Sequence, residues 1–331
     1  MRRKLRVGLV SWAHVHSPGI AAALRSLDQV ECSGLYDEEP ERGRAAAAEA
    51  GLASHQELDS LLAASEAVVV ASTNADHRRY TEAAARAGVH VLSEKPLATT
   101  VEDGRAMVDA CAAAGVRLAT AFPVRESRAV MALRDAIREG TLGRVLAVRG
   151  TNPGQYPGGW FGDRALAGGG AVMDHTVHVA DALRWLLDDE VTRVQAEVGS
   201  YLWGLEVDDC GILTLDFAGG TFASIDSSWS RPRSYPTWGT VTLHVVGERA
   251  TTDIDVFRQA LVRYDDDAMR VRYVPWGDDL TRRMIAGFVD AILDGRPVPI
   301  TGEDGLRALE VAIAAYRSSE LGRPVEISEL Q

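Results

Sequence analysis

Residues 5–18 read LRVGLVSWAHVHSP, and this stretch decides the fold of the first part of the chain. An apolar run leads into small residues and then into a proline and a helical segment, which is the order strand, tight turn, helix. A dinucleotide site needs this order, because the amides of the turn face a pyrophosphate and the helix N-terminus lies behind it. Serine, alanine and histidine replace the three glycines of the G-x-G-x-x-G pattern. We nevertheless expect a nicotinamide dinucleotide to bind this turn, through Ser11, Ala13, His14, Val15 and His16.

Short runs rich in Val, Leu and Ile alternate with Ala-rich helical stretches through the first 120 residues. Parallel sheets require this alternation, since each connection must cross back over the sheet. The predicted strands are Leu5–Val10, Val30–Tyr36, Ala67–Ala71, Val89–Leu92 and Arg117–Ala121. The predicted helices are Gly19–Ser26, Pro40–Ala50, His55–Ala63, Asp76–Ala87 and Val101–Ala114. Residues 1–121 are therefore predicted to form an α/β Rossmann domain with a doubly wound parallel sheet.

A different pattern begins after residue 121. Helices are predicted at Val130–Glu139, Ala171–Leu187, Asp279–Leu293 and Gly302–Leu321. Long β-type runs are predicted at Thr192–Leu202, Asp208–Phe217, Thr221–Trp229, Thr240–Val246 and Leu261–Tyr264. Turn signals between these runs favour antiparallel pairing. Residues 122–331 are expected to form a second α/β domain with a large, mainly antiparallel open sheet that binds substrate and mediates oligomerisation.

Composition excludes several classes of protein. The 331 residues carry a formal net charge of −12, which disfavours partners bound through a phosphate backbone or anionic lipids, so neither nucleic acid nor a membrane is expected. No apolar stretch approaches 18 residues, and the three cysteines have neither disulfide nor zinc-site spacing. We therefore expect a cytoplasmic protein with reduced thiols.

Asp37 follows the second predicted strand, 21 residues after His16. An acidic residue about 20 residues beyond the turn accepts hydrogen bonds from the adenosine ribose in NAD sites. Glu38 and Glu39 follow it and would repel a 2′-phosphate, so NAD is favoured over NADP unless Arg42 or Arg44 turns toward the site. A solvated charged turn is the alternative interpretation.

Polar residues follow two neighbouring strands, at the sheet edge where open α/β sheets bind ligands. They are Thr73, Asn74 and His77 after one strand, and Glu94 and Lys95 after the next. A lysine in a desolvated crevice beside a positively charged nicotinamide has reason to handle protons. A surface ion pair between Glu94 and Lys95 is the simpler alternative.

Three glycines, Gly168–Gly170, lead into a helical segment that carries Asp174, His178 and Asp181. Positions i, i+4 and i+7 share one helix face, so the two carboxylates are predicted to orient His178 for acid–base chemistry. His175 places a second imidazole nearby. Asp174 and His178 are also compatible with metal ligation, but the sequence shows no third and fourth ligand, so no metal is expected.

These residues together resemble the Gfo/Idh/MocA family, which includes glucose–fructose oxidoreductase and inositol 2-dehydrogenase. The similarity covers nearly the whole chain, and its most specific parts are Glu94-Lys95-Pro96 and the segment from Gly168 through His178 to Asp181. The resemblance implies NAD(P)-dependent oxidation or reduction of sugars and polyols. It also implies a homodimer or homotetramer formed through the sheet of the second domain.

Site roles follow from the same resemblance. Lys95 matches a lysine near nicotinamide and substrate, Asp174 an aspartate that contacts substrate hydroxyls, and His178 the histidine that exchanges the hydroxyl proton. His175 and Thr176 replace an apolar residue and a glycine, which is expected to reshape the substrate pocket. Aromatic and arginine side chains suit a polyol ligand, and the further pocket candidates are Arg125, Trp160, Arg164, Trp229, Arg231, Tyr235 and Trp238.

The sequence thus predicts an NAD-dependent sugar or polyol dehydrogenase that uses Lys95, Asp174 and His178 as catalytic residues. Two alternatives stay open. One is elimination or hydrolysis of a glycoside through transient oxidation with tightly bound NAD. The other is a ligand-binding relative that has lost hydride transfer, as the altered turn at Ser11–Ala13 allows.

Overall fold

The computed structural model describes residues 3–330 except 236, 259 and 276, and it contains two large sheets. The first is parallel, with six strands in the order β3-β2-β1-β4-β5-β6. Its strands are β1 Leu5–Val10, β2 Val30–Tyr36, β3 Ser54–His55, β4 Ala67–Val70, β5 His90–Ser93 and β6 Leu118–Thr120. This order is that of a doubly wound sheet, which confirms the predicted Rossmann fold.

The helices of this half are α1 Ser17–Ser26, α2 Pro40–Ala50, α3 Leu58–Ala64, α4 His77–Arg86 and α5 Val101–Ala113. Every residue of β4 is buried, as expected of a strand covered on both faces. Strand β3 was missed because it has only two residues, and the predicted helix from His55 included one of them. Helix α3 instead begins at Leu58.

The second sheet has seven strands in the order β12-β11-β7-β10-β9-β8-β15. They are β7 Val145–Pro153, β8 Val191–Gly199, β9 Cys210–Phe217, β10 Phe222–Ser228, β11 Thr242–Gly247, β12 Thr251–Asp255 and β15 Val325–Glu326. Among the described strands of this sheet, only β7 and β10 pair in parallel, which confirms the predicted, mainly antiparallel sheet. Strands β7, β12 and β15 were not predicted, and the predicted strand Leu261–Tyr264 lies in a separate two-stranded sheet.

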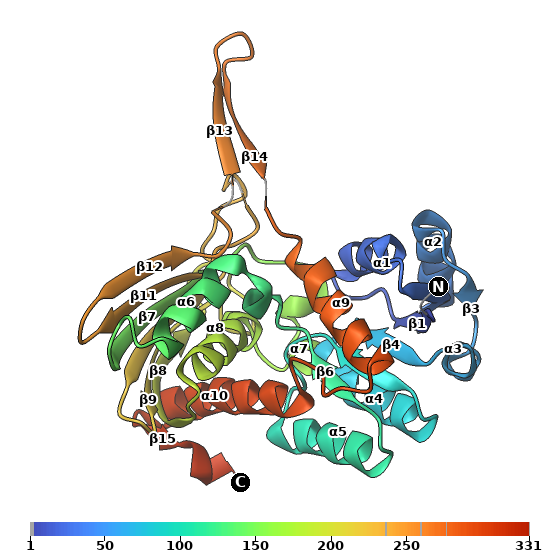
Figure 1. The fold of residues 1–331 in the computed structure, drawn as a ribbon, viewed down its shortest axis with the longest axis horizontal. Helices are drawn as coiled ribbons and strands as arrows, with labels where there is room; N and C mark the ends of the chain where they lie inside the picture. The colour runs from blue at the N-terminus through green and yellow to red at the C-terminus, as the bar shows by residue number, and fades with distance from the viewer. Residues whose placement is uncertain (1–2, 236, 259, 276, 331) are drawn as a thin grey trace.

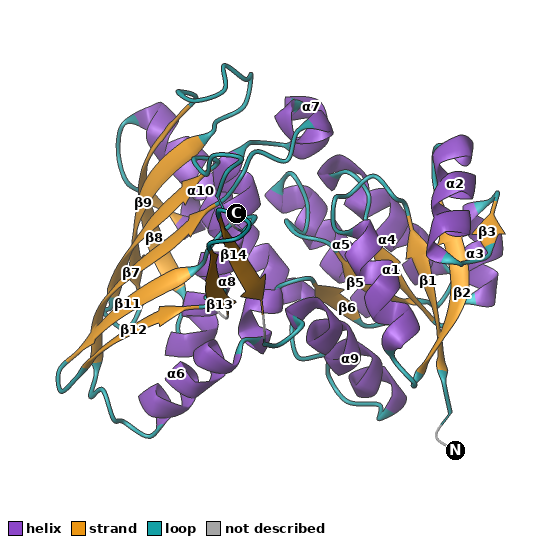
Figure 2. Ribbon diagram, turned by 90° about the horizontal axis from the view of Figure 1, so that it is seen from above, coloured by secondary structure: helices purple, strands orange, loops and turns teal. Residues whose placement is uncertain are grey.

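The remaining helices are α6 Arg128–Arg138, α7 Arg164–Ala167, α8 Ala171–Leu187, α9 Leu280–Leu293 and α10 Gly302–Leu321. Figure 2 shows the two sheets on opposite sides of the molecule with helices between them. Ile212 and Phe222 are exposed on the face of the seven-stranded sheet that points away from α8 and α10. No helix among the described residues has the length and apolar content needed to cross a membrane.

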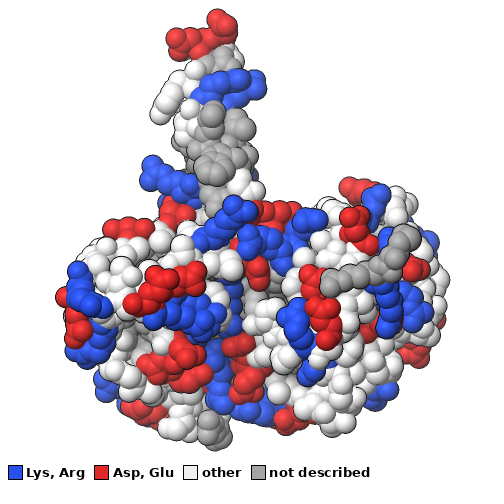
Figure 3. All heavy atoms as spheres, viewed as in Figure 1, with Lys and Arg blue, Asp and Glu red and all other residues white. Residues whose placement is uncertain are grey.

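A hairpin of β13 Ala260–Asp265 and β14 Arg270–Pro275 projects from the body of the protein (Figures 1 and 3).

After the hairpin, α9 and the first turns of α10 pack against the Rossmann half of the protein. Met284, Phe288 and Leu309 belong to the same hydrophobic cluster as β1 and β4. The domain division at residue 121 therefore stays a prediction, because the core around the first sheet also contains residues from 284 to 312.

Candidate active site

The start of α8 is fixed by a buried carboxylate. Asp208 accepts hydrogen bonds at 2.7 Å from the amides of Gly170 and Val172 and from the hydroxyl of Tyr316. A Cβ at Gly170 would lie 1.7 Å from the carbonyl oxygen of Asp208, so only glycine fits there. This contact explains the end of the glycine-rich segment and sets where the first two turns of α8 place their side chains. Asp208 was not predicted, because its role depends on a contact between distant segments.

The ammonium of Lys95, which follows β5, meets Asp174 in the first turn of α8. Lys95 Nζ donates to the carbonyl oxygen of Asp174 at 3.2 Å and forms an ion pair with its carboxylate. The other carboxylate oxygen faces Trp229 Nε1 and His175 Nε2, each at 3.1 Å. Burial alone would raise the pKa of Asp174, but Lys95 and His175 outweigh it and hold that pKa well below its usual value. Asp174 is therefore a buried, ionised and tightly oriented carboxylate.

His178 lies one turn further along α8. Its ring packs edge-on against Phe122, with ring centroids 5.9 Å apart, and its Nδ1 is buried without a hydrogen-bond partner. Burial, and then the positive charge of Lys95, lowers the pKa of His178 well below 6.5. The imidazole is thus neutral near pH 7 and able to accept a proton.

His175 lies at the wall of the same cavity and is buried. Its Nδ1 is 2.6 Å from the carbonyl oxygen of Asn152, while its Nε2 faces Asp174. The ring therefore bridges the Asn152 carbonyl and the Asp174 carboxylate. A Cβ at Gly154 would lie 2.4 Å from the ring, so a glycine makes room for it. His175 therefore helps to orient Asp174.

The prediction that Asp181 helps to orient His178 is wrong. Arg125 Nε donates to the carboxylate of Asp181 at 2.8 Å, and Arg125 Nη2 lies 3.0 Å from Asp304. Both Arg125 and Asp181 are buried in this network. Arg125 does not line the cavity, and its guanidinium is held by two carboxylates, so a substrate contact for it has no structural support. Position i+7 brings Asp181 to a partner on another element instead of to the histidine.

The turn after β1 keeps the conformation that a dinucleotide site requires. Ser11 has φ 70°, the left-handed conformation that glycine usually supplies. The side chain of His16 does not enter the helix–strand contact, because it turns into the cavity, where its Nδ1 lies 3.1 Å from Glu94 Oε1. His14 is buried behind it and Val15 is exposed. The turn and the N-terminus of α1 therefore fit a dinucleotide despite the missing glycines.

Asp37 is not free to accept the ribose hydroxyls that the sequence predicted. Its carboxylate accepts the amides of Trp12 and Glu39 at 2.6 and 2.7 Å and the guanidinium of Arg42 at 2.9 to 3.1 Å. Arg42 also pairs with Glu38 and Glu39. The carboxylate is fully buried, so a ribose contact there requires Arg42 to move. Arg44, in contrast, contacts Gln56 at the surface.

Thr73, Asn74 and His77 are buried and bind protein groups close to the sheet edge. Thr73 donates to Asp76, and Asn74 donates to the carbonyl oxygen of Ala167 at 2.9 Å. His77 Nδ1 is 2.9 Å from the carbonyl oxygen of Pro96, so it supports the segment that carries Lys95. None of the three lines the described cavity. They position the loops of the site instead of forming its surface.

One cavity of about 610 Å³ collects eight of the seventeen residues predicted for catalysis, cofactor binding or substrate binding. Its walls include His14, Val15, His16, Glu94, Lys95, Asp174, His175 and His178. Arg164 and Trp160 lie outside its lining. Arg164 donates to the carbonyl oxygen of Glu206, and the indole of Trp160 donates to that of Ala13 at 2.9 Å. Trp160 thus ties the loop before α7 to the dinucleotide turn.

Part of the cavity wall comes from distant segments that were not predicted from the sequence. Asn152, Phe257, Asp278 and Thr281 line the cavity, and Trp238, which was among the pocket candidates, joins them. Asp278 and Thr281 stand at the start of α9, where nothing in the pattern distinguishes a cavity wall from an ordinary helix start. Only the packing of α9 beside α1 brings them to the site.

The buried His77 predicts a loss of stability in mild acid. Burial lowers its pKa in the folded protein, although the Pro96 carbonyl and the charge of Glu94 oppose this. The unfolded chain therefore binds more protons below pH 6.5, and the free energy of unfolding falls as the pH drops below that value. Between pH 6.5 and 5.5 the contribution of His77 should fall by up to about 1 kcal/mol. Urea unfolding of the wild type and of His77→Leu at both pH values measures it, and an equal pH dependence in the two proteins would contradict the prediction.

Comparisons with known proteins agree with the two-part fold. A family model described as oxidoreductase family, NAD-binding Rossmann fold, matches residues 5–122, and one for the GFO/IDH/MocA C-terminal domain matches residues 130–253. The 1,5-anhydro-D-fructose reductase of Ensifer adhaerens is 33% identical, over 97% of this chain and 98% of its own length. The myo-inositol 2-dehydrogenase of Thermotoga maritima is 29% identical over 80% of each chain. Among solved structures, GenD2 from gentamicin A biosynthesis in complex with NAD has a TM-score of 0.89 and 27% identity, covering 98% of this chain and 97% of its own.

Proposed function

The chain belongs to the GFO/IDH/MocA oxidoreductase family, and we propose that it transfers a hydride between NAD and a hydroxyl-bearing carbon of a sugar, inositol or related polyol. The observation that carries this proposal is the meeting of Lys95, Asp174 and His178 at one cavity beside the dinucleotide turn. Lys95 and Asp174, which form the ion pair, are 79 residues apart in the sequence.

The three side chains divide the work that oxidation of an alcohol needs. The neutral imidazole of His178 accepts the hydroxyl proton of the substrate, and it returns the proton in the reverse direction. The ammonium of Lys95 donates a hydrogen bond to the same oxygen and stabilises its developing negative charge. Asp174 holds this ammonium in place, and Trp229 and His175 in turn hold Asp174. When bound, the nicotinamide supplies the hydride acceptor or donor.

The cofactor would be held by the turn of Ser11, Ala13, Val15 and His16, by the N-terminus of α1 and by the segment at Glu94 and Lys95. NAD in preference to NADP is supported by the charges after β2. Three carboxylates, of Asp37, Glu38 and Glu39, surround the single guanidinium of Arg42, which leaves this surface negative toward a 2′-phosphate. Two observations support the fit to a dinucleotide. Ser11 has a left-handed backbone conformation, and the side chain of His16 turns into the cavity, away from the contact between helix and strand.

The cavity walls support a polyol as substrate. Trp238 and Phe257 offer apolar faces to the C–H groups of a ring, while Asn152 and Thr237 add polar residues to the cavity wall. The two named relatives, a reductase of an anhydrosugar and an inositol dehydrogenase, act on substrates of this class.

A homodimer or homotetramer formed through the seven-stranded sheet is also part of the proposal. Its support is the face of that sheet away from α8 and α10, where Ile212 on β9 and Phe222 on β10 are 55% and 59% exposed. Apolar side chains on an open sheet face are typical of surfaces buried between subunits.

The direct test is to incubate the full chain with NAD or NADP and a panel of sugars and inositols and to follow absorbance of the reduced cofactor. We expect reduction of NAD by at least one polyol, and calorimetric binding of NAD at least about tenfold tighter than that of NADP. In Arg42→Ala this ratio should rise further, because the guanidinium bound to Asp37, Glu38 and Glu39 is removed. Substrate turnover without net NADH would instead indicate elimination, and absence of binding to either cofactor would overturn the proposal.

A further inference from the structure

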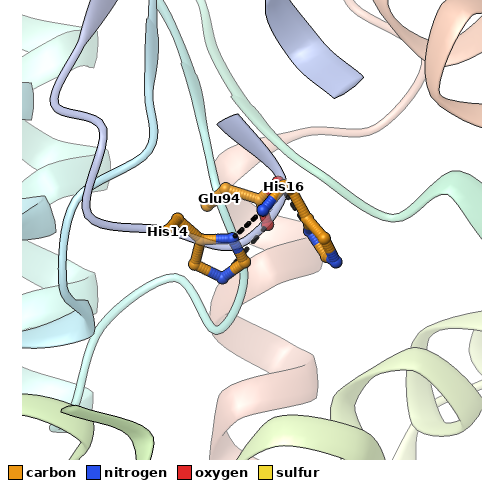
Figure 4. Close-up of side chains that lie close together, drawn as sticks. All are labelled: His14, His16 and Glu94. Carbon is orange, nitrogen blue, oxygen red and sulfur yellow. Dashed lines mark hydrogen bonds and ion pairs between the residues drawn. The ribbon is translucent and has the colours of Figure 1, made fainter. Parts of the chain in front are cut away.

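A second cluster of side chains at the cavity has no part in the proton transfer proposed above, although two of its members, His16 and Glu94, also belong to the proposed dinucleotide site. His14 and His16 belong to the turn after β1, and Glu94 follows β5 (Figure 4). One ligand atom from each of the three residues lies within 4.8 Å of the others. Two imidazoles and a carboxylate are the ligand types that hold zinc and related divalent ions.

One atom of the cluster lacks a partner. His14 is 2% exposed, and its Nε2 is buried and makes no hydrogen bond. This nitrogen lies 4.0 Å from Glu94 Oε2, which is too long for a hydrogen bond. Leaving a buried polar group unpaired costs about 1–3 kcal/mol, so the atom points to a missing ligand.

The spacing suits one small ion between the three groups. Bonds of about 2.0–2.2 Å in a tetrahedral zinc site place neighbouring ligand atoms about 3.3–3.5 Å apart. The observed separations of 3.1 Å from His16 Nδ1 to Glu94 Oε1 and 4.0 Å from His14 Nε2 to Glu94 Oε2 lie on either side of this value. Rotation of the exposed His16 side chain adjusts the first separation, and a small shift of the His14 ring or of the Glu94 carboxylate is needed to shorten the second.

The charges nearby also favour a cation. Glu94 and Asp174 contribute two carboxylates, and Lys95 contributes one ammonium, which is already bound to Asp174. One net negative charge is left on Glu94, whose other neighbours in the cluster are imidazoles. Since the site borders the cavity, a bound ion would keep an open position toward it.

We infer that His14, His16 and Glu94 form a binding site for a divalent transition-metal ion of the zinc type. The three residues supply three protein ligands, and the fourth position takes water or an oxygen of a ligand in the cavity. Two of these ligands, His16 and Glu94, border the proposed dinucleotide site, but the proposed hydride transfer requires no metal ion, so this ion site goes beyond the proposed function.

Binding has a local structural consequence. In the structure His14 Nδ1 accepts the amide of His16 at 3.2 Å, which puts the proton of the neutral ring on Nε2. Metal ligation at Nε2 displaces that proton, and the ring then carries its proton on Nδ1. The amide of His16 must therefore turn away, and the change is confined to the turn before α1.

The experiment uses the full chain after removal of metal by chelation, titrated calorimetrically with Zn²⁺ alone and, in parallel, with Co²⁺ followed by visible absorption. We expect one ion per chain and the intense cobalt bands of a four-coordinate site. His16→Ala, an exposed position whose loss leaves the core intact, should weaken binding more than about 100-fold, beyond the roughly 10–100-fold cost of losing an outer-shell partner. Glu94→Gln should act similarly.

Two control variants separate this site from the rest of the chain. His178→Ala should keep the stoichiometric ion, which distinguishes the cluster from ligation by Asp174 and His178. His244→Ala removes a surface imidazole on β11, paired with Asp253, and should also keep it. Absence of stoichiometric binding, or unchanged binding in His16→Ala, would overturn the inference. Because zinc binding is measured without cofactor or substrate, its failure is distinct from failure of the proposed oxidoreductase activity.

Discussion

Replacing His178 with asparagine should lower the turnover number for polyol oxidation about 100- to 10,000-fold, the range that general acid–base groups contribute. Asparagine keeps a polar side chain at the cavity wall but accepts no proton at neutral pH. The ring packs only edge-on against Phe122 and its Nδ1 has no partner, so its removal breaks no hydrogen bond. Stability and affinity for NAD should therefore change little.

Steady-state kinetics on the best substrate of the panel, together with calorimetry of NAD binding, measure this prediction. The expected pattern is a large fall in turnover with an unchanged dissociation constant for NAD. Thr176→Ser, two residues before His178 on α8 and bonded to Ser227, is the matched control, since its hydroxyl lies away from the cavity lining. A turnover of His178→Asn within about tenfold of the wild type would remove His178 from the role of proton acceptor.

Replacing Lys95 with methionine should lower the free energy of unfolding by about 3–5 kcal/mol, in addition to abolishing activity. Methionine matches the length of the lysine stem, but it leaves the buried carboxylate of Asp174 without its main counter-ion. Trp229 and His175 still donate to Asp174, which places the expected loss toward the lower end of that range.

The double variant Lys95→Met, Asp174→Asn tests whether the unpaired charge is the cause. An asparagine is neutral, so the double variant should recover part of the stability lost in Lys95→Met, although it stays inactive. Urea unfolding of the two single variants and the double variant gives the coupling energy directly. Equal stability of Lys95→Met and the wild type would show that the pair contributes nothing to folding.

The charged groups of this chain show that a sequence pattern does not predict which counter-ion a carboxylate binds. Asp37 had the spacing of a ribose-binding carboxylate, but Arg42 on the next helix covers it. Asp181 had the helical spacing to orient His178, but Arg125 binds it from another element. A charged side chain near a low-dielectric interior takes the counter-ion that folding brings within reach, and periodicity along one element does not specify that counter-ion.

The sequence by itself determined the alternating elements of the Rossmann half, the mainly antiparallel second sheet, and the family signatures around Lys95 and His178. These features are local, because strand and helix patterns and tight turns depend on neighbouring residues. The tertiary structure alone decided which side chains meet. It brought Glu94 to His16 across 78 residues, α9 to the cavity wall, and Asp208 to the start of α8. Contacts between distant segments follow from how the layers pack, and packing depends on the whole chain at once.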